Sequence, residues 1–176
     1  MPWLTDSPSA PAWLVDAVEP TEGESLRALT VKGELADALV DGVKACENRS
    51  WPIPRGALLI HKGLAATPKE WVKLVKRAAR GPPLPKGHIV GAVYIDRTTT
   101  LAEARGEPFE EWAAGPLVHV VKHSYKFARP VPHNGALSRW RVNQAALAAI
   151  REQLATAPAK DVVRAAQLGL RARGKR

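Results

Sequence analysis

The segment Glu34–Val43 constrains the fold most, because a helical apolar period is followed at once by residues that stop a helix. Its apolar residues recur at every third or fourth position, so that one face of a helix is apolar. Gly42 is suited to end that helix, and Pro52 and Pro54 exclude a helix further on. The sequence therefore predicts a short helix, Glu34–Val40, followed by a segment that is not helical.

A dense cluster of charged and aromatic side chains follows this helix. Its members are Lys44, Glu47, Arg49, Ser50, Trp51 and Arg55. We expect the cluster to lie at the helix end and on the loop after it, where a scaffold presents side chains to a partner. The apolar run Ala57–Ile60 that comes next is typical of a buried strand.

The spacing within the cluster resembles a known family signature. The pattern is Gly42-x-Lys44-x-x-Glu47-x-Arg49-Ser50-Trp51, followed by Arg55-Gly56-x-Leu58-x-Ile60-His61. It resembles the signature of the ASCH domain, which is named for homology to a transcriptional coactivator, has prokaryotic relatives and belongs to the PUA-like superfamily. The resemblance covers residues 26–157. It implies an α+β fold, in which a PUA-like mixed β-barrel is flanked by α-helices.

Further matches follow in the order of that family. The segment Gly87–Gly91 resembles the next barrel strand, and Trp140 stands where the family often has a late aromatic residue. Many members have Gln-Pro followed by Trp or Tyr before the first helix, whereas this chain has Val31-Lys32-Gly33 there.

Outside the cluster, short strands alternate with helices. The predicted strands are Arg27–Val31, His88–Arg97, Leu117–Phe127 and Ser138–Val142. One helix should begin at Thr67, which forms a capping box with Glu70, and another should be capped by Asn143. Pro130 and Pro132 indicate a loop between the last two strands.

The ends of the chain differ in charge from its centre. Residues 1–25 hold five carboxylates and no Lys or Arg, and we expect an acidic, proline-rich, mostly irregular arm with a short helix around Ala12–Val18. Trp3 and Trp13 suggest that this arm docks, so it is either a weak cover over the basic body or a mobile leader. Residues 26–157 would form the ASCH domain, and residues 158–176 a basic C-terminal helix and tail.

The charge balance favours a polyanionic partner. The chain has 26 Lys and Arg against 17 Asp and Glu, a net charge of +9, and the −5 of residues 1–25 leaves +14 for the rest. From Trp112 to Arg151 there is no carboxylate at all. A purely solvated surface would normally mix both signs, so this stretch indicates a binding face.

We therefore expect RNA, or single-stranded nucleic acid more generally, to bind in a basic cleft around the GxKxxExRSW motif. Lys44 and Arg49 would bind phosphate, and Glu47 would orient them or accept from a base amino group. Trp51 and Trp140 are candidate stacking platforms. The full predicted binding set is Lys44, Glu47, Arg49, Ser50, Trp51, Arg55, Lys122, Lys126, Arg139, Trp140 and Arg141.

Three alternatives stay open. The resemblance implies a hydrolase, because some ASCH relatives are amidohydrolases on acylated cytidine and others are ribonucleases. Lys44 and Glu47 would then be the catalytic acid–base pair, acting on RNA or on acylated cytidine nucleosides, although Glu47 stands where the amidohydrolases have Thr. The second alternative is a structural ion-pair network at the helix end. The third is a protein-interaction adaptor that uses the C-terminal helix.

The remaining reactive residues point to structural roles. Cys46 is the single cysteine, which excludes an intrachain disulfide, and we interpret it as a small buried hydrophobe. His119 and His123 are four residues apart on a predicted strand, where they do not face one metal ion, so no metal or cofactor is expected. His61 follows a buried strand and is interpreted as a structural histidine. No apolar run approaches the length of a membrane-spanning helix, and we expect a cytoplasmic monomer.

Overall fold

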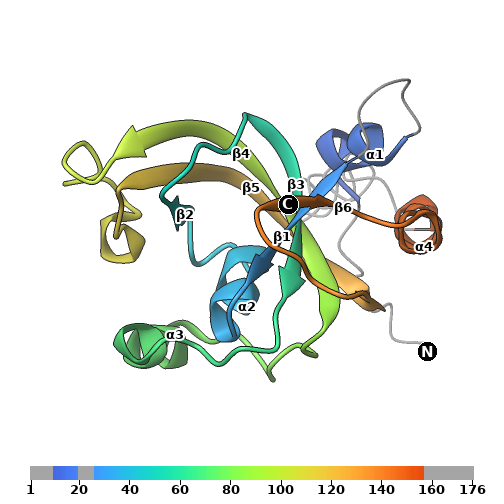
Figure 1. Ribbon diagram of the computed structural model, residues 1–176, viewed down its shortest axis with the longest axis horizontal. Helices are drawn as coiled ribbons and strands as arrows, with labels where there is room; N and C mark the ends of the chain where they lie inside the picture. The colour runs from blue at the N-terminus through green and yellow to red at the C-terminus, as the bar shows by residue number, and fades with distance from the viewer. Residues whose placement is uncertain (1–9, 20–25, 157–176) are drawn as a thin grey trace, which may run out of the picture.

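The computed structural model describes residues 10–19 and 26–156, and every structural statement below refers to these ranges (Figure 1). Six strands in them form one sheet. They are β1 (Arg27–Val31), β2 (Cys46–Arg49), β3 (Gly56–Lys62), β4 (His88–Thr100), β5 (Leu117–Pro132) and β6 (Arg139–Arg141). Their order is β2-β5-β4-β3-β1-β6, and β1 runs parallel to β3 while the other neighbours are antiparallel. The predicted α+β class is confirmed, with a mixed sheet.

Helices cover both faces of this sheet (Figure 1). They are α1 (Ala12–Val18), α2 (Glu34–Val40), α3 (Val72–Ala78) and α4 (Gln144–Ala155), with short 3-10 turns η1 (Lys69–Trp71) and η2 (Glu110–Trp112). α2 and α3 pack on one face, and α1 and α4 on the other. None of the helices within the described ranges has both the length and the apolar character needed to cross a membrane.

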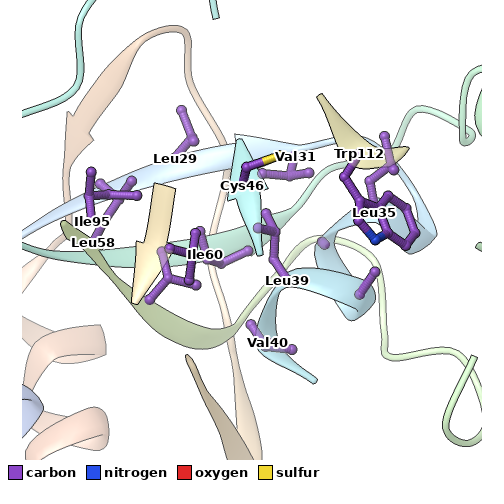
Figure 2. Packing of buried hydrophobic residues seen from close by; sticks show 14 of the residues in the cluster. Leu29, Val31, Leu35, Leu39, Val40, Cys46, Leu58, Ile60, Ile95 and Trp112 are labelled. Carbon is purple, nitrogen blue, oxygen red and sulfur yellow. The ribbon is translucent and has the colours of Figure 1, made fainter. Parts of the chain in front are cut away.

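The two faces have separate cores because successive side chains of a strand point to opposite sides. Leu58 and Ile60 belong to the core under α2, whereas Leu59 between them belongs to the core under α1 and α4. Cys46 lies in the α2-side core among aliphatic side chains, which confirms its interpretation as a small buried hydrophobe (Figure 2). Burial raises the pKa of its thiol to about 11, so the reactive thiolate is not formed at neutral pH.

The sheet does not close into the predicted β-barrel, and this corrects the expected architecture. β2 and β6 are the two terminal strands of the sheet. β2 is only four residues long, and Pro52 and Pro54 soon follow, which have no N–H to extend a ladder. A side chain instead connects β2 to β1, because Nη2 of Arg49 donates to the carbonyl oxygen of Thr30 at 3.1 Å.

Several elements have the predicted bounds. β1, α1 and α2 begin and end where the sequence indicates, and Gly42 leaves α2 in a left-handed conformation with φ +76°. The predicted cap of α4 is confirmed, because Oδ1 of Asn143 accepts the N–H of Ala146 at 2.8 Å. These elements depend on signals within a few residues of each other.

The predicted capping box at Thr67 is wrong. The helical segment there begins with η1, and Thr67 instead serves the start of α2. Its Oγ1 accepts the N–H of Glu34 at 2.9 Å and also bonds to the Glu34 carboxylate. The reason is that α2 starts after Gly33, which has no side chain to cap it, so a residue from a distant loop supplies the oxygen.

The loop predicted at Pro130 and Pro132 is also wrong, since β5 continues to Pro132. On one side β5 pairs with β4 over this length, and Val131 lies opposite Ile89. On the other side β2 pairs only with the first four residues of β5. The prolines therefore lie where one side of the strand needs no ladder N–H.

Residues 10–19, the described part of the acidic arm, pack against the rest of the fold. Leu14 and Val18 of α1 are buried in the core that α4 also covers. The Trp13 ring stacks on His123 with centroids 6.1 Å apart and meets Tyr94 edge-on at 5.9 Å. The helix Ala12–Val18 is therefore not a mobile leader. Trp3 and the predicted C-terminal helix, residues 158–176, lie outside the described residues.

Candidate functional site

The centre of the signature is a buried chain of three charges. Nζ of Lys44 lies 2.6 Å from Oε2 of Glu47, and Nη2 of Arg49 lies 2.9 Å from Oε1 of the same carboxylate. Nζ of Lys44 also donates to the carbonyl oxygen of Cys46 at 2.5 Å. Both carboxylate oxygens thus have a cationic partner, as a buried carboxylate requires.

Local backbone geometry directs Lys44 inward. After Gly42 the chain turns back, and the N–H groups of Val43 and Lys44 both donate to the carbonyl oxygen of Ala38. Lys44 is only 2% exposed as a result. Glu47 and Arg49 then lie on β2 rather than on the predicted loop, which corrects their expected setting. β2 is paired to β5 with Glu47 opposite His119.

Arg49 has contacts on three sides. Its guanidinium bonds to Glu47 and to Thr30 on β1, and it lies 5.9 Å from the ring centroid of Trp51. Its Nε has no hydrogen-bond partner although that atom is buried. The side chain is 26% exposed. The Nε–H of Arg49 is therefore a donor without an acceptor, although the rest of the guanidinium is held in place.

A cavity of about 350 Å³ lies beside this chain of charges. Residues of β1, β2, α2 and three loops surround it: Leu29, Thr30, Val31, Lys32, Leu35, Glu47, Asn48, Arg49, Gly63, Leu64, Ala65, Ala136, Leu137 and Ser138. Its walls combine aliphatic side chains with one carboxylate and one guanidinium. Apolar walls with a few fixed polar groups are typical of ligand pockets.

Basic side chains lie at the edge of this cavity. Lys32 is exposed and lines it, and Arg139 is exposed on β6 directly opposite Leu29, another lining residue. Arg141 is exposed two residues further along β6, opposite Arg27, where β1 no longer lines the cavity. Among the described residues none of these three cations has an ion-pair partner. The edge of the cavity is thus positively charged and uncompensated.

Lys44 belongs to the predicted set but does not line the cavity. Of the motif residues, Glu47 and Arg49 line it, while Ser50 is exposed and Trp51 is half-buried outside it. Arg55 is also exposed, and its Nη2 lies 3.7 Å from Oδ1 of Asp96. Only two residues of the motif cluster therefore face the cavity.

The two lysines of β5 lie apart from the cavity. Lys126 is paired with Asp41 at 2.6 Å and lines a smaller pocket under α3. Lys122 is exposed and lines neither pocket. The structure does not bring these two residues together with Glu47 and Arg49.

Trp140, a candidate stacking platform in the sequence, is only 7% exposed and so presents no open ring face. Its Nε1 donates to Oγ1 of Thr30 at 3.1 Å, and the ring packs against His61 and His133. The physical reason is the strand period: Arg139 and Arg141 point to solvent, so the residue between them points inward. Trp140 supports the wall instead of offering an open face.

Two buried histidines are held by hydrogen bonds on both nitrogens. His61 contacts Oγ1 of Thr30 at 3.2 Å and the carbonyl oxygen of His133 at 2.8 Å. His119 contacts Oγ1 of Thr98 at 2.8 Å and the carbonyl oxygen of Trp51 at 3.1 Å. Burial is the main cause that lowers the pKa of each imidazole. These contacts support the interpretation of His61 as a structural histidine.

Much of the cavity wall is formed by residues outside the predicted set. Asn48 lines it and holds the 101–115 insertion, because Nδ2 donates to the carbonyl oxygen of Trp112 and Oδ1 accepts the N–H of Ala114. Leu64 and Leu137 also line it and are 77% and 92% exposed. A leucine in a loop without any apolar period is a signal that points to such a surface.

No protein-family model matches the sequence, and no curated protein matches it. Among solved structures, the chain is similar to an ASCH protein from Zymomonas mobilis, with 12% identity and a TM-score of 0.48 over 76% of this chain and 96% of that one. Two point mutants of that protein give TM-scores of 0.47 and 0.44, again at 12% identity. They cover 73% and 72% of this chain and 98% and 94% of their own. The assignment to the α+β class rests on the strands and helices described above.

Proposed function

We propose that this protein binds single-stranded nucleic acid, with RNA as the preferred form, and that the cavity beside Glu47 and Arg49 takes one base. The observation that carries the proposal is the fixed pair of a carboxylate and a guanidinium, 2.9 Å apart, on the wall of a 350 Å³ cavity with an uncompensated basic edge. The resemblance of the motif to ASCH domains adds RNA as the expected form.

The two polar groups suit the edge of a base. A carboxylate accepts from an exocyclic amino group, and an arginine donates to ring nitrogens and carbonyl oxygens. Unstacked bases of single-stranded RNA expose these edges, whereas a duplex hides them. The volume lies in the range of about 300–1,000 Å³ that is usual for ligand pockets. Leu29, Val31 and Leu35 provide the apolar surface for the ring.

The basic edge suits the sugar–phosphate backbone. Lys32, Arg139 and Arg141 are exposed and have no carboxylate partner among the described residues. Cations of this kind release counterions when they neutralise phosphates, which makes the affinity depend on salt. Base recognition in the cavity and backbone binding at its edge would then act together.

The position of Lys44 favours binding over hydrolysis by a Lys44–Glu47 acid–base pair. Its ammonium is engaged by Glu47 and by a backbone carbonyl, the residue is 2% exposed, and it does not line the cavity. A general acid or base must come within hydrogen-bond reach of the reacting group. Glu47 remains accessible from the cavity and is the residue through which a catalytic role would have to act.

A salt titration tests this proposal. Binding of a fluorescent ten-nucleotide single-stranded RNA should weaken as salt rises, with a log–log slope that reflects about 4–7 phosphate contacts. Arg49→Met should lower the affinity by about 10–100-fold, because it removes charge-assisted hydrogen bonds. Lys32→Gln and Arg139→Gln should each reduce the slope by about one.

The matched control is Lys73→Gln on α3, an exposed lysine that lines none of the cavities described here. It should leave the slope and the affinity close to those of the natural chain. A salt-independent affinity, or equal losses in Lys73→Gln and Lys32→Gln, would contradict binding at this cavity. Single-stranded DNA and duplex RNA of the same length serve as competitors, and both should bind less tightly.

A further inference from the structure

A second cavity of about 390 Å³ lies next to the first. His61, Leu64, His133 and Asn134 are among the residues that line it. None of them except Leu64 lines the first cavity. Of the residues named in the signature, only His61 lines this second space.

Three features make the two cavities neighbours. Leu64 lines both of them. The chain runs from one to the other without a break, since residues 132–135 line the second cavity and residues 136–138 the first. Thr30, which lines the first, is hydrogen-bonded through Oγ1 to Nδ1 of His61, which lines the second. The two cavities therefore share a wall at Leu64 and along residues 132–138.

His133, which is half-buried, offers ring surface to this cavity instead of free nitrogens, whereas His61 is only 2% exposed. Nδ1 of His133 donates to the carbonyl oxygen of Asn134 at 2.6 Å, and its Nε2 accepts the N–H of Asn143 at 3.2 Å. The His133 ring is backed by Trp140, with centroids 4.6 Å apart. Both nitrogens of His61 are likewise engaged. An aromatic ring held in place in this way is a surface on which a base can stack.

Asn134 adds a group that can bind the edge of a base. Its side chain is exposed, and its amide has no hydrogen-bond partner among the described residues. An amide carries donors and an acceptor, so it can pair with more than one kind of base edge.

A cation, Lys86, is bonded to the residue that both cavities share, although it lines neither cavity itself. Nζ of Lys86 donates to the carbonyl oxygen of Leu64, the residue that both cavities share, at 3.1 Å. Lys86 is exposed and has no ion-pair partner among the described residues. A phosphodiester that joins a nucleotide in one cavity to a nucleotide in the other would pass close to this ammonium.

We propose that the second cavity is a subsite for the neighbouring nucleotide, so that the protein recognises two consecutive nucleotides of a single strand, with Lys86 binding the phosphate between them. This inference rests on the proposed function of the first cavity. Trp140 acts in it as a positioning residue, because it backs the His133 ring and lines neither cavity itself.

Calorimetric titration with short oligonucleotides tests the inference. The probes are the one-, two- and three-nucleotide members of the four homopolymer RNA series, each with a 5′-phosphate. The dinucleotide should bind at least about tenfold more tightly than the mononucleotide, as one more stacked base provides. The third nucleotide should add about threefold or less, since it has no cavity.

Variants test whether the gain in affinity from one to two nucleotides comes from the second cavity. Lys86→Gln and Asn134→Ala should each remove most of the gain from one to two nucleotides and leave mononucleotide affinity unchanged. Lys73→Gln is the matched control and should preserve the full gain. Thermal unfolding of all three variants checks that these exposed positions leave the fold intact.

The outcomes separate the two proposals. If no mononucleotide and no longer RNA binds, the proposed function fails and the inference fails with it. If mononucleotides bind but dinucleotides bind no more tightly, the first cavity stands and the second subsite is disproved. A gain that persists in both Lys86→Gln and Asn134→Ala also disproves it, because the second nucleotide would then lie elsewhere.

Discussion

Nζ of Lys44 lies 2.6 Å from Oε2 of Glu47, and the two side chains are 2% and 8% exposed. This ion pair stands in the interior, next to the cavity that Glu47 lines. Removing one partner of such a pair leaves the charge of the other buried and uncompensated. The pair therefore links the stability of the fold to the chemistry of the site.

Lys44→Met should destabilise the protein by about 3 kcal/mol, the low end of the range for breaking a buried pair, since Arg49 still neutralises Glu47. Urea unfolding followed by circular dichroism measures this loss. Lys73→Met, an exposed change on α3, should alter the unfolding free energy by less than about 0.5 kcal/mol. A Lys44→Met variant as stable as Lys73→Met would show that the ion pair contributes little.

Glu47→Gln separates three roles of this residue. If Glu47 binds a base edge, preference among the four mononucleotides should weaken by about 1–3 kcal/mol. The melting temperature should also fall, because Lys44 loses its buried partner. Nucleotide titrations and a thermal melt on the same variant measure both effects.

The two other roles of Glu47 predict different patterns. A general base would show itself as a turnover of RNA or acylated cytidine that falls by about 10²–10⁴-fold in Glu47→Gln. A purely structural partner would lower the melting temperature and leave base preference unchanged. We expect weaker preference and no turnover in either protein.

Stability should decrease as the pH falls below about 6.5, the ordinary pKa of histidine. Burial lowers the pKa of His61 and of His119 in the folded chain. In the unfolded chain these groups take up protons near pH 6.5 while the folded chain does not, so acid favours unfolding. The contribution is complete above pH 6.5 and is lost as the pH falls toward the folded pKa values.

Urea unfolding at a series of pH values between 7 and 5 measures this dependence. His119→Gln should flatten it, because one of the two depressed histidines is gone. His123→Gln is the control for the loss of a histidine outside the core, since His123 lies on the same strand with its exposed ring stacked on Trp13. A pH dependence that is equally steep in all three proteins would exclude His119 as its source.

Leu14→Ala should destabilise the protein by about 2–5 kcal/mol, the usual cost of truncating a buried leucine. The residue lies on α1, in the acidic segment, and has no exposed surface. Asp16→Asn on the exposed side of α1 should change stability little. Urea unfolding compares the two. Equal stability would mean that α1 is not part of the folded core.

Local signals account for what the sequence predicts well. The apolar period of α2, the strand β1 and the Asn143 cap each depend on residues that lie within a few positions of one another. The Arg139–Arg141 segment carries a signal that was misinterpreted. On a strand, two exposed arginines indicate that the tryptophan between them is buried.

The site itself depends on contacts between distant segments. Arg49 reaches Thr30 on another strand, and Leu64 and Leu137 come together from two separate loops. Thr67 serves the start of α2 rather than its own helix. No pattern within a window of ten residues encodes such pairings, so the sequence predicts the chemistry of the motif but not the cavity.

The structure of the protein with a bound mononucleotide tests the central claim most directly. Crystals soaked with each of the four 5′-mononucleotides should show the base in the 350 Å³ cavity, with its edge within hydrogen-bond distance of Glu47 and Arg49 and its phosphate toward Lys32 or Arg139. A nucleotide bound elsewhere, such as over Lys122, with the cavity filled only by water, would contradict the account.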